Sequence, residues 1–253
     1  MSMIEVQTEL TRVRNDARTK IADWESSRNR RTGQLYHYSS DDNTRYVDGT
    51  SGDDVLNWRQ FDGGKELILG GDGNDKLFGG KGDDTLFGEE GKDSLFGSMG
   101  SDTLVGGGDD DYLNGEQGND YILGGAGNDT LYAGKVYGSK GSASLFGGSG
   151  TDTLISQGGH KGHHYLDGGD EDDYLEGNQG VIAQDLGGEG IWVLPVLHSY
   201  SGHRTGVNSP CTASECLTGQ EQFLRSENFS NAYGVGGFDL EVVSRQPSAR
   251  ICS

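Results

Sequence analysis

Residues 70–132 consist of seven consecutive nine-residue blocks that never change register. Every block starts with glycine, has aspartate at its sixth position and has leucine or isoleucine at its eighth. A short fixed period predicts a solenoid, because each copy forms the same small unit and successive units stack. The sixth-position aspartates are Asp75, Asp84, Asp93, Asp102, Asp111, Asp120 and Asp129. The eighth-position residues are Leu77, Leu86, Leu95, Leu104, Leu113, Ile122 and Leu131.

Each block divides into a strand and a turn. Positions seven to nine are apolar or β-prone, and with a period of two the eighth side chain points inward. Positions one to six are rich in Gly, Asp and Asn, which tolerate the backbone angles of tight turns. We therefore predict a three-residue strand and a six-residue turn per block, with two blocks in each coil. Coils stacked about 4.8 Å apart would form two parallel sheets around a thin aliphatic core, which is an all-β parallel β-roll.

The carboxylates predict a metal. Turns on one side of the roll would stack every 18 residues, so the sixth-position aspartates would form columns with a spacing of about 5 Å. Such a column repels itself unless cations lie between the carboxylates. Carboxylate and turn carbonyl oxygens suit calcium, which accepts a flexible cage of oxygen ligands. Five sites are predicted in the regular blocks, between Asp75 and Asp93, Asp84 and Asp102, Asp93 and Asp111, Asp102 and Asp120, and Asp111 and Asp129.

The blocks resemble the nonapeptide repeats of the RTX family of calcium-binding secreted proteins, whose motif GGxGxDxUx is an established signature. The resemblance covers residues 49–177 and implies a right-handed parallel β-roll with calcium buried between successive turns. The candidate calcium-binding residues are aspartates and glycines of these turns. They are Asp54, Gly70, Gly71, Gly73, Asp75, Gly79, Gly80, Gly82, Asp84, Gly88, Gly91, Asp93, Gly97, Gly100, Asp102, Gly106, Asp111, Gly115, Gly118, Asp120, Gly124, Gly125, Gly127, Asp129, Gly147, Gly148, Gly150, Asp152 and Asp173.

Some blocks depart from the pattern. The first block keeps Asp54, whereas the second has Glu66 at the sixth position. In the block that begins at Gly106, Asp109 replaces the fourth-position glycine, and we expect Gly108 to shift so that the turn still forms.

After Tyr132 the blocks are interrupted by insertions of five and three residues. Ala143 and His164 replace the aspartate in two of these blocks, while Asp152 and Asp173 retain it. We expect the roll to continue here with weaker or missing calcium sites.

His160, His163 and His164 fall in one predicted turn. They could bind a transition metal, or they could be the exposed imidazoles of a repeat that has lost its calcium. Because no cysteine or other fourth ligand is near them in the sequence, the second interpretation is favoured.

Residues 1–48 form a separate N-terminal segment. Apolar residues recur at spacings of three and four, which predicts an amphipathic helix over residues 1–31. This helix could cap the end of the roll, which needs protection against strand addition, or could join subunits as a coiled coil. Residues 32–48 are polar and predict a linker.

The ninth positions of the blocks predict an apolar ladder on the outer faces of the roll. Phe78 should stack on Phe96, and Phe87 on Val105, because residues 18 apart share a sheet. An exposed apolar ladder usually has a cover, which here could be the N-terminal helix, the C-terminal region, another protein or a second copy.

Residues 178–253 lose the period and predict a C-terminal cap that also carries an export region. Strand-like segments occur at 191–197 and 238–243, and the second resembles the acidic and apolar ends of exported RTX proteins. Such relatives use an uncleaved C-terminal signal, which would place this protein outside the cell. Three cysteines, Cys211, Cys216 and Cys252, leave one thiol over after any single pairing.

Charge and motifs narrow the functional classes. The net charge of −20 is concentrated after residue 45, which argues against a nucleic-acid partner, and no apolar stretch is long enough to span a membrane. The chain lacks the HExxH, GxSxG and Walker motifs, so we expect no enzyme. Its few aliphatic residues and 45 glycines predict that folding requires the metal. We therefore expect an extracellular calcium-binding structural or assembly protein, whose N-terminal helix or apolar ladder could join copies into a homo-oligomer or a larger assembly. The alternatives are an adhesive module for a polysaccharide or receptor, and part of a toxin or hydrolase.

Overall fold

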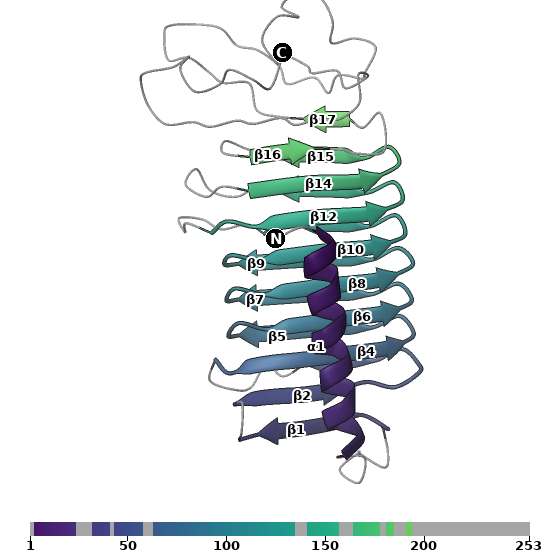
Figure 1. Cartoon of the computed structure of the whole chain (residues 1–253), viewed down its shortest axis with the longest axis vertical. Helices are drawn as coiled ribbons and strands as arrows, with labels where there is room; N and C mark the ends of the chain where they lie inside the picture. The colour runs from purple at the N-terminus through teal and green to yellow at the C-terminus, as the bar shows by residue number, and fades with distance from the viewer. Residues whose placement is uncertain are drawn as a thin grey trace, which may run out of the picture.

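The structure, a computed structural model, describes residues 3–23, 32–40, 43–57, 63–134, 141–156, 164–177, 181–184 and 191–193. Within these residues the strands form two sheets that lie face to face. Both sheets run along the long axis of the molecule (Figure 1). Sheet A contains, in spatial order, β1 (Leu35–Ser39), β2 (Thr44–Asp48), β4 (Lys65–Asp72), β6 (Thr85–Glu90), β8 (Thr103–Gly108), β10 (Tyr121–Ala126), β12 (Ser144–Ser149), β14 (His164–Asp170) and β16 (Val181–Gln184). Sheet B contains β3 (Val55–Asn57), β5 (Lys76–Lys81), β7 (Ser94–Met99), β9 (Tyr112–Gln117), β11 (Thr130–Tyr132), β13 (Thr153–Ser156), β15 (Tyr174–Gly177) and β17 (Ile191–Val193).

The parallel β-roll is confirmed. From β2 onward, successive strands alternate between the two sheets, and each pairs in parallel with the strand one coil away. Leu77 pairs with Leu95, which is the predicted offset of 18 residues. Seven of the strands, β5 to β10 and β12, are six residues long rather than three. They are longer because the pairing continues into the next block, where Gly80 lies opposite Ser98.

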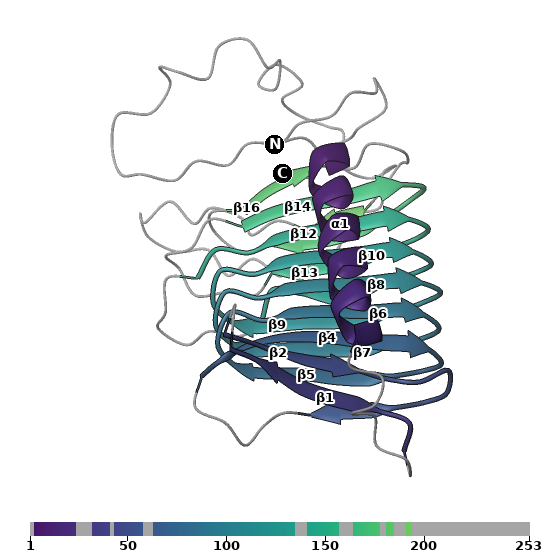
Figure 2. The same ribbon diagram turned by 60° about the horizontal axis from the view of Figure 1, so that its bottom comes forward.

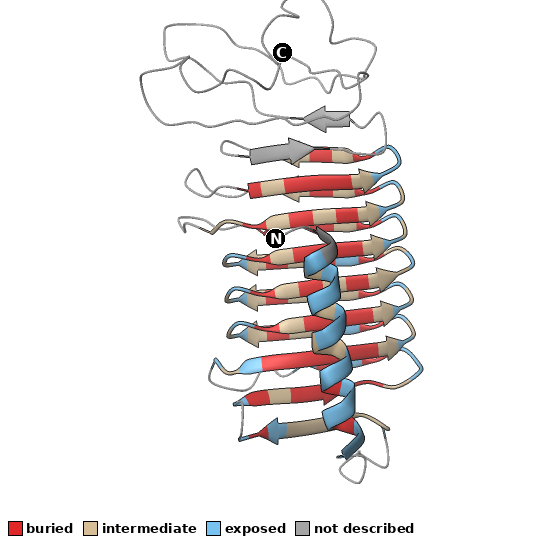
Figure 3. Cartoon of the chain, viewed as in Figure 1, coloured by how far each residue is buried: buried red, intermediate tan, exposed pale blue. Residues whose placement is uncertain are grey.

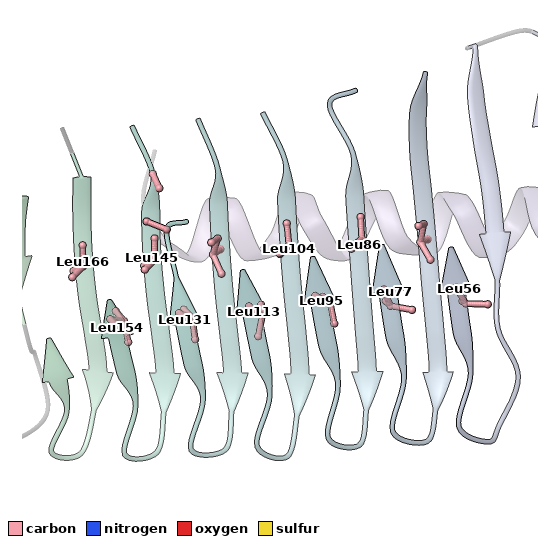
Figure 4. Packing of buried hydrophobic residues seen from close by; sticks show 14 of the residues in the cluster. Leu56, Leu77, Leu86, Leu95, Leu104, Leu113, Leu131, Leu145, Leu154 and Leu166 are labelled. Atoms are coloured by element: carbon pink, nitrogen blue, oxygen red, sulfur yellow. The ribbon is translucent and has the colours of Figure 1, made fainter. Parts of the chain in front are cut away.

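The core is the predicted column of eighth-position residues. Leu77, Leu86, Leu95 and their equivalents are fully buried and alternate between the two sheets (Figure 4). Buried and partly exposed residues alternate along strands such as β5 and β7, whereas β4, β6 and β10 of sheet A contain runs of buried residues (Figure 3). One large aliphatic side chain per strand therefore suffices to join the sheets.

The N-terminal helix α1 (Met3–Asp23) lies along the outer face of sheet A, not across the end of the roll as one of the two alternatives held (Figure 2). Ala17 and Ile21 are buried against Tyr46, Leu69 and Phe87. A helix of this length spans about 30 Å, which matches roughly six strands spaced 4.8 Å apart. The helix therefore covers the predicted ladder of Phe87 and Val105.

Polar contacts anchor the same helix. Arg18 donates a hydrogen bond to Glu89, and Arg14 lies 3.8 Å from the same carboxylate. Lys20 Nζ donates to the hydroxyl of Tyr46 at 2.8 Å. These contacts fix which face of the helix meets the sheet.

We expect Ile21→Ala to lower the free energy of unfolding by about 2–5 kcal/mol, because Ile21 is fully packed between helix and sheet. Urea unfolding would measure the loss. Gln7→Ala, on the exposed face of the helix, is the matched control, with an effect within about 0.5 kcal/mol. Equal effects of the two variants would show that the helix does not dock as described.

The segment 32–48, which the sequence predicted as a linker, contains the strands β1 and β2, which corrects that expectation. β1 pairs antiparallel with β2, and β2 pairs in parallel with β4. The β1–β2 hairpin thus forms the N-terminal end of sheet A, with Leu35 and Val47 buried. The aromatic and β-branched residues of this segment favour strands, but the polar residues between them made the sequence look like a linker.

The roll also extends past residue 177, where the sequence analysis ended it. β16 pairs with β14, and β17 pairs with β15, so one more coil follows. β17 falls within the predicted strand 191–197. The predicted strand 238–243, the export region and the three cysteines lie outside the described residues.

Candidate calcium sites

The turns of the roll form two edges. We call the turns that lead from sheet A to sheet B the first edge, and those that lead from sheet B to sheet A the second edge. The sixth-position residues of the first edge are Asp54, Asp75, Asp93, Asp111, Asp129, Asp152 and Asp173. Those of the second edge are Glu66, Asp84, Asp102, Asp120, Ala143 and His164. All of them are buried.

One carboxylate oxygen of each aspartate joins neighbouring coils. The Oδ1 atom of Asp93 accepts a hydrogen bond from the backbone N–H of Asp75 at 2.7 Å, and Asp111 Oδ1 accepts from Asp93 N–H at 2.8 Å. The same bond recurs along both edges, from Asp54 to Asp173 and from Glu66 to Asp120. The predicted columns are therefore present, and each Oδ1 is committed to the protein.

The second carboxylate oxygen has no hydrogen-bond partner among the described residues at eight of these aspartates. They are Asp75, Asp84, Asp93, Asp102, Asp111, Asp120, Asp129 and Asp152. A buried charged oxygen without a partner is costly. The arrangement therefore calls for a cation.

Glycine at the first position makes room for that oxygen. A Cβ placed on Gly79 would lie 2.6 Å from Asp84 Oδ2 and 2.9 Å from the carbonyl oxygen of Gly97, one coil further on. The equivalent glycines have the same surroundings, so a carboxylate oxygen and a carbonyl oxygen approach one point. They are Gly70, Gly88, Gly97, Gly106, Gly124 and Gly147, and Gly115 for its carboxylate.

The remaining candidate glycines shape the turns. They occupy the second and fourth positions and adopt positive φ angles. They are Gly71, Gly73, Gly80, Gly82, Gly91, Gly100, Gly118, Gly125, Gly127, Gly148 and Gly150. Asp109 takes the same left-handed conformation, with φ of 69°, so the turn forms without the expected shift of Gly108.

The donor chemistry fits calcium better than a transition metal. No group of three or more His, Cys, Asp or Glu side chains suited to a metal occurs within the described ranges. A cation between two coils would instead meet carboxylate and backbone carbonyl oxygens, which are the ligands of a hard cation such as calcium.

A comparison with protein families decides the identity of the repeat. A model of four copies of the RTX calcium-binding nonapeptide repeat matches residues 62–95, 69–104, 96–131, 132–160 and 165–181. These repeats belong to the RTX calcium-binding family. Nothing matches the chain among curated proteins, and nothing matches it among solved structures. Across the described part of the chain, no helix has the length and apolarity needed to cross a membrane.

Asp54, at the start of the RTX roll, differs from the other candidates. Its Oδ1 accepts from Gln34 Nε2 at 2.7 Å, and its Oδ2 accepts from the backbone N–H of Thr50 at 2.7 Å. Protein donors therefore satisfy both oxygens, and Asp54 closes the end of the column.

The insertions in the RTX roll fall on the second edge. Across first-edge turns the eighth-position residues stay nine apart, as from Leu145 to Leu154. Across second-edge turns the separation grows to 14 from Leu131 to Leu145 and to 12 from Leu154 to Leu166. The first-edge column therefore continues in register through Asp152 and Asp173, and the irregularity expected after Tyr132 is confined to the second edge.

The fifth position of the repeat has a role that the sequence analysis missed. Asn74 Oδ1 accepts from the backbone N–H of Lys92 at 3.0 Å, and Asp83 Oδ1 accepts from Ser101 N–H at 2.8 Å. Asn128 repeats the bond with Thr151 at 2.9 Å. The recurrence of Asn and Asp directly before the sixth-position aspartate was the signal. It marks a second, outer set of bonds between coils.

Burial raises the pKa of the sixth-position carboxyls in the metal-free roll. The pKa of Asp93 rises to about 7 and that of Asp111 to about 8, mainly through burial, with neighbouring carboxylates adding to the shift. The pKa of Asp84 rises further, to about 9, through burial and through the neighbouring Glu66. At neutral pH the metal-free roll therefore holds carboxyls that resist ionisation.

The raised pKa values predict how the stability of the metal-free roll depends on pH. The folded metal-free chain binds these protons more tightly than the unfolded chain, so its stability is greatest below about pH 4 and falls as pH rises through about 6 to 9. We expect the chelator-treated protein to gain β-structure when pH is lowered from 8 to 5. Far-UV circular dichroism would measure the change, and loss of structure on acidification would contradict the burial of these groups. With calcium present, lower pH should weaken binding because protons compete.

Proposed function

We propose that this protein is an extracellular calcium-binding structural or assembly protein whose RTX roll folds when calcium binds. The observation that carries the proposal is the pair of carboxylate columns, with eight buried oxygens that lack hydrogen-bond partners among the described residues. Without metal, these charges oppose the stacking of coils. With calcium between them, the same charges hold neighbouring coils together.

The geometry suggests seven calcium sites rather than the five counted in the regular blocks. Five would lie on the first edge, between successive aspartates from Asp75 to Asp173. Two would lie on the second edge, between Asp84 and Asp102 and between Asp102 and Asp120. The aspartates would supply carboxylate oxygens, and the first-position glycines would supply space and carbonyl oxygens.

Calcium concentration would act as the signal for folding. Extracellular calcium modules bind at about 10⁻⁴–10⁻³ M, well above the concentration inside a cell. The unfolded chain would therefore pass an exporter and fold outside. The C-terminal region would carry the export signal, as in the exported relatives that it resembles.

An assembly role is supported by the outer face of sheet B. Phe78 and Phe96 stack with ring centroids 5.0 Å apart and planes at 10°, and Tyr112 and Tyr132 continue the ladder. Within the described residues, α1 covers the corresponding strip of sheet A but not the rings from Phe96 to Tyr132. An apolar strip of this length favours contact with another protein or a second copy.

The second candidate function is an adhesive module for a surface polysaccharide. This function is favoured by Tyr112, which is 36% exposed and lies two residues before the polar Asn114 on the same strand, β9. However, the rings of Phe78 and Phe96 stack and cover each other's faces, and it is the flat face of an aromatic ring that packs against a sugar. This geometry ranks the polysaccharide below a protein partner. The RTX roll is a structural calcium-binding fold, and we infer that the chain is not an enzyme.

Size-exclusion chromatography with light scattering, first in chelator and then in millimolar calcium, tests the proposal. We expect an expanded chain in chelator and a compact particle in calcium. The mass in calcium then separates a monomeric binder from an assembling protein. A chain that is equally compact in chelator would overturn calcium-coupled folding.

A further inference from the structure

Two successive turns of the second edge lack a carboxylate. Ala143 and His164 occupy the positions that Asp102 and Asp120 occupy in the preceding coils, and both are buried. The backbone nitrogen of Ala143 lies 3.2 Å from His164 Nδ1. The imidazole therefore accepts the bond that an aspartate Oδ1 accepts elsewhere on this edge.

The chemistry of His164 differs from that of an aspartate. A ring nitrogen that accepts a hydrogen bond is unprotonated, so the proton of the neutral imidazole is on Nε2. The ring then presents a donor where an aspartate presents an anionic acceptor. Calcium takes oxygen ligands, and a protonated Nε2 cannot bind a transition metal either. His164 is also buried, which corrects the expectation of an exposed imidazole for this residue, while His160 and His163 lie outside the described residues.

The same two turns have also lost the first-position glycine. Ala133 and Ser156 follow Tyr132 and Ile155, and the strand register places them level with Gly115. Both are buried. At turns that carry aspartate, a Cβ at this position would collide with the carboxylate oxygen, as at Gly79. The space that the cation site requires is therefore filled by side-chain atoms.

The insertions agree with this assignment. The separations of 14 and 12 residues occur at these two turns, whereas every first-edge turn of the same coils keeps the separation of nine. A turn that does not hold a metal is free to lengthen, because no cage geometry constrains its backbone.

We propose that the two edges of the RTX roll differ in their metal content: the first edge is lined with calcium through Asp173, and the second only through Asp120. Beyond Asp120, the His164 imidazole and the side chains of Ala133 and Ser156 close the second edge without metal. This inference rests on the proposed calcium sites, and it limits them to one edge in the C-terminal coils.

The test compares two asparagine variants of the full chain. In His164→Asn, the amide Oδ1 retains an acceptor for Ala143 N–H; in Asp152→Asn, it retains the acceptor for Asp129 N–H. Equilibrium dialysis against calcium, with the bound metal counted by mass spectrometry, measures the ions per chain. Circular dichroism in saturating calcium confirms that each variant is folded.

We expect His164→Asn to bind as many ions as the unmodified chain and Asp152→Asn to bind one or two fewer. Loss of an ion in folded His164→Asn would overturn the metal-free second edge. Unchanged binding by folded Asp152→Asn would instead overturn the proposed calcium sites. As a gain-of-site test, Ala133→Gly combined with Ala143→Asp should add an ion opposite Asp120. A folded double variant without an added ion would contradict the assignment of these two side chains.

Discussion

Replacing Asp111 with asparagine is expected to raise the calcium concentration needed for folding by about tenfold or more. Asparagine retains the Oδ1 acceptor for the backbone N–H of Asp93. It replaces Oδ2, which is buried without a hydrogen-bond partner among the described residues, by an amide donor. Two proposed sites, toward Asp93 and toward Asp129, lose a ligand and a negative charge at once. Calcium titration followed by circular dichroism measures the midpoint.

Asp110→Asn is the control, because it changes the adjacent residue of the same turn. Asp110 is at the fifth position, and its Oδ1 accepts from Asn128 N–H, a bond that asparagine retains. The net charge changes equally in both variants. An equal shift of the two midpoints would show that the calcium concentration needed for folding depends on overall charge and not on the buried column.

Gly79→Ala is expected to destabilise the calcium-loaded protein by about 3 kcal/mol or more. The added Cβ would lie 2.6 Å from Asp84 Oδ2 and 2.9 Å from the carbonyl oxygen of Gly97. Gly79 is in the interior of β5, so the backbone cannot move away without breaking the pairing with β7. Urea unfolding in saturating calcium measures the loss, and the calcium midpoint should rise with it.

Gly52→Ala separates this steric effect from the general effect of removing a glycine. A Cβ at Gly52 would meet nothing within 4 Å, and the residue is exposed. We expect a change within about 0.5 kcal/mol. If Gly79→Ala were equally mild, the proposed cation position beside Asp84 would have room for a methyl group, and the site assignment would fail.

The repeat itself was enough to predict the roll. A buried residue at the eighth position of every nine-residue block and glycines in every turn leave few ways to stack the coils, and the pairing of Leu77 with Leu95 follows directly. The aspartate columns were predictable for the same reason, because equal periods place equal residues above one another. The fifth-position bonds between Asn74 and Lys92 could also have been inferred from this period.

The irregular features required the packed structure. Whether α1 covers a face or an end depends on its contacts with Leu69 and Phe87, which are far from it in the sequence. The β1–β2 hairpin becomes stable only against β4, so its short polar sequence resembles a linker.

The sequence alone thus determined the period, the core and the carboxylate spacing, because each of these is a local property repeated along the chain. The side on which each insertion falls, and with it the difference between the two edges, depends on which sheet the chain has just left. That alternation exists only in three dimensions, where Asp129 regains register with Asp152 while Ala143 and His164 meet on the opposite edge.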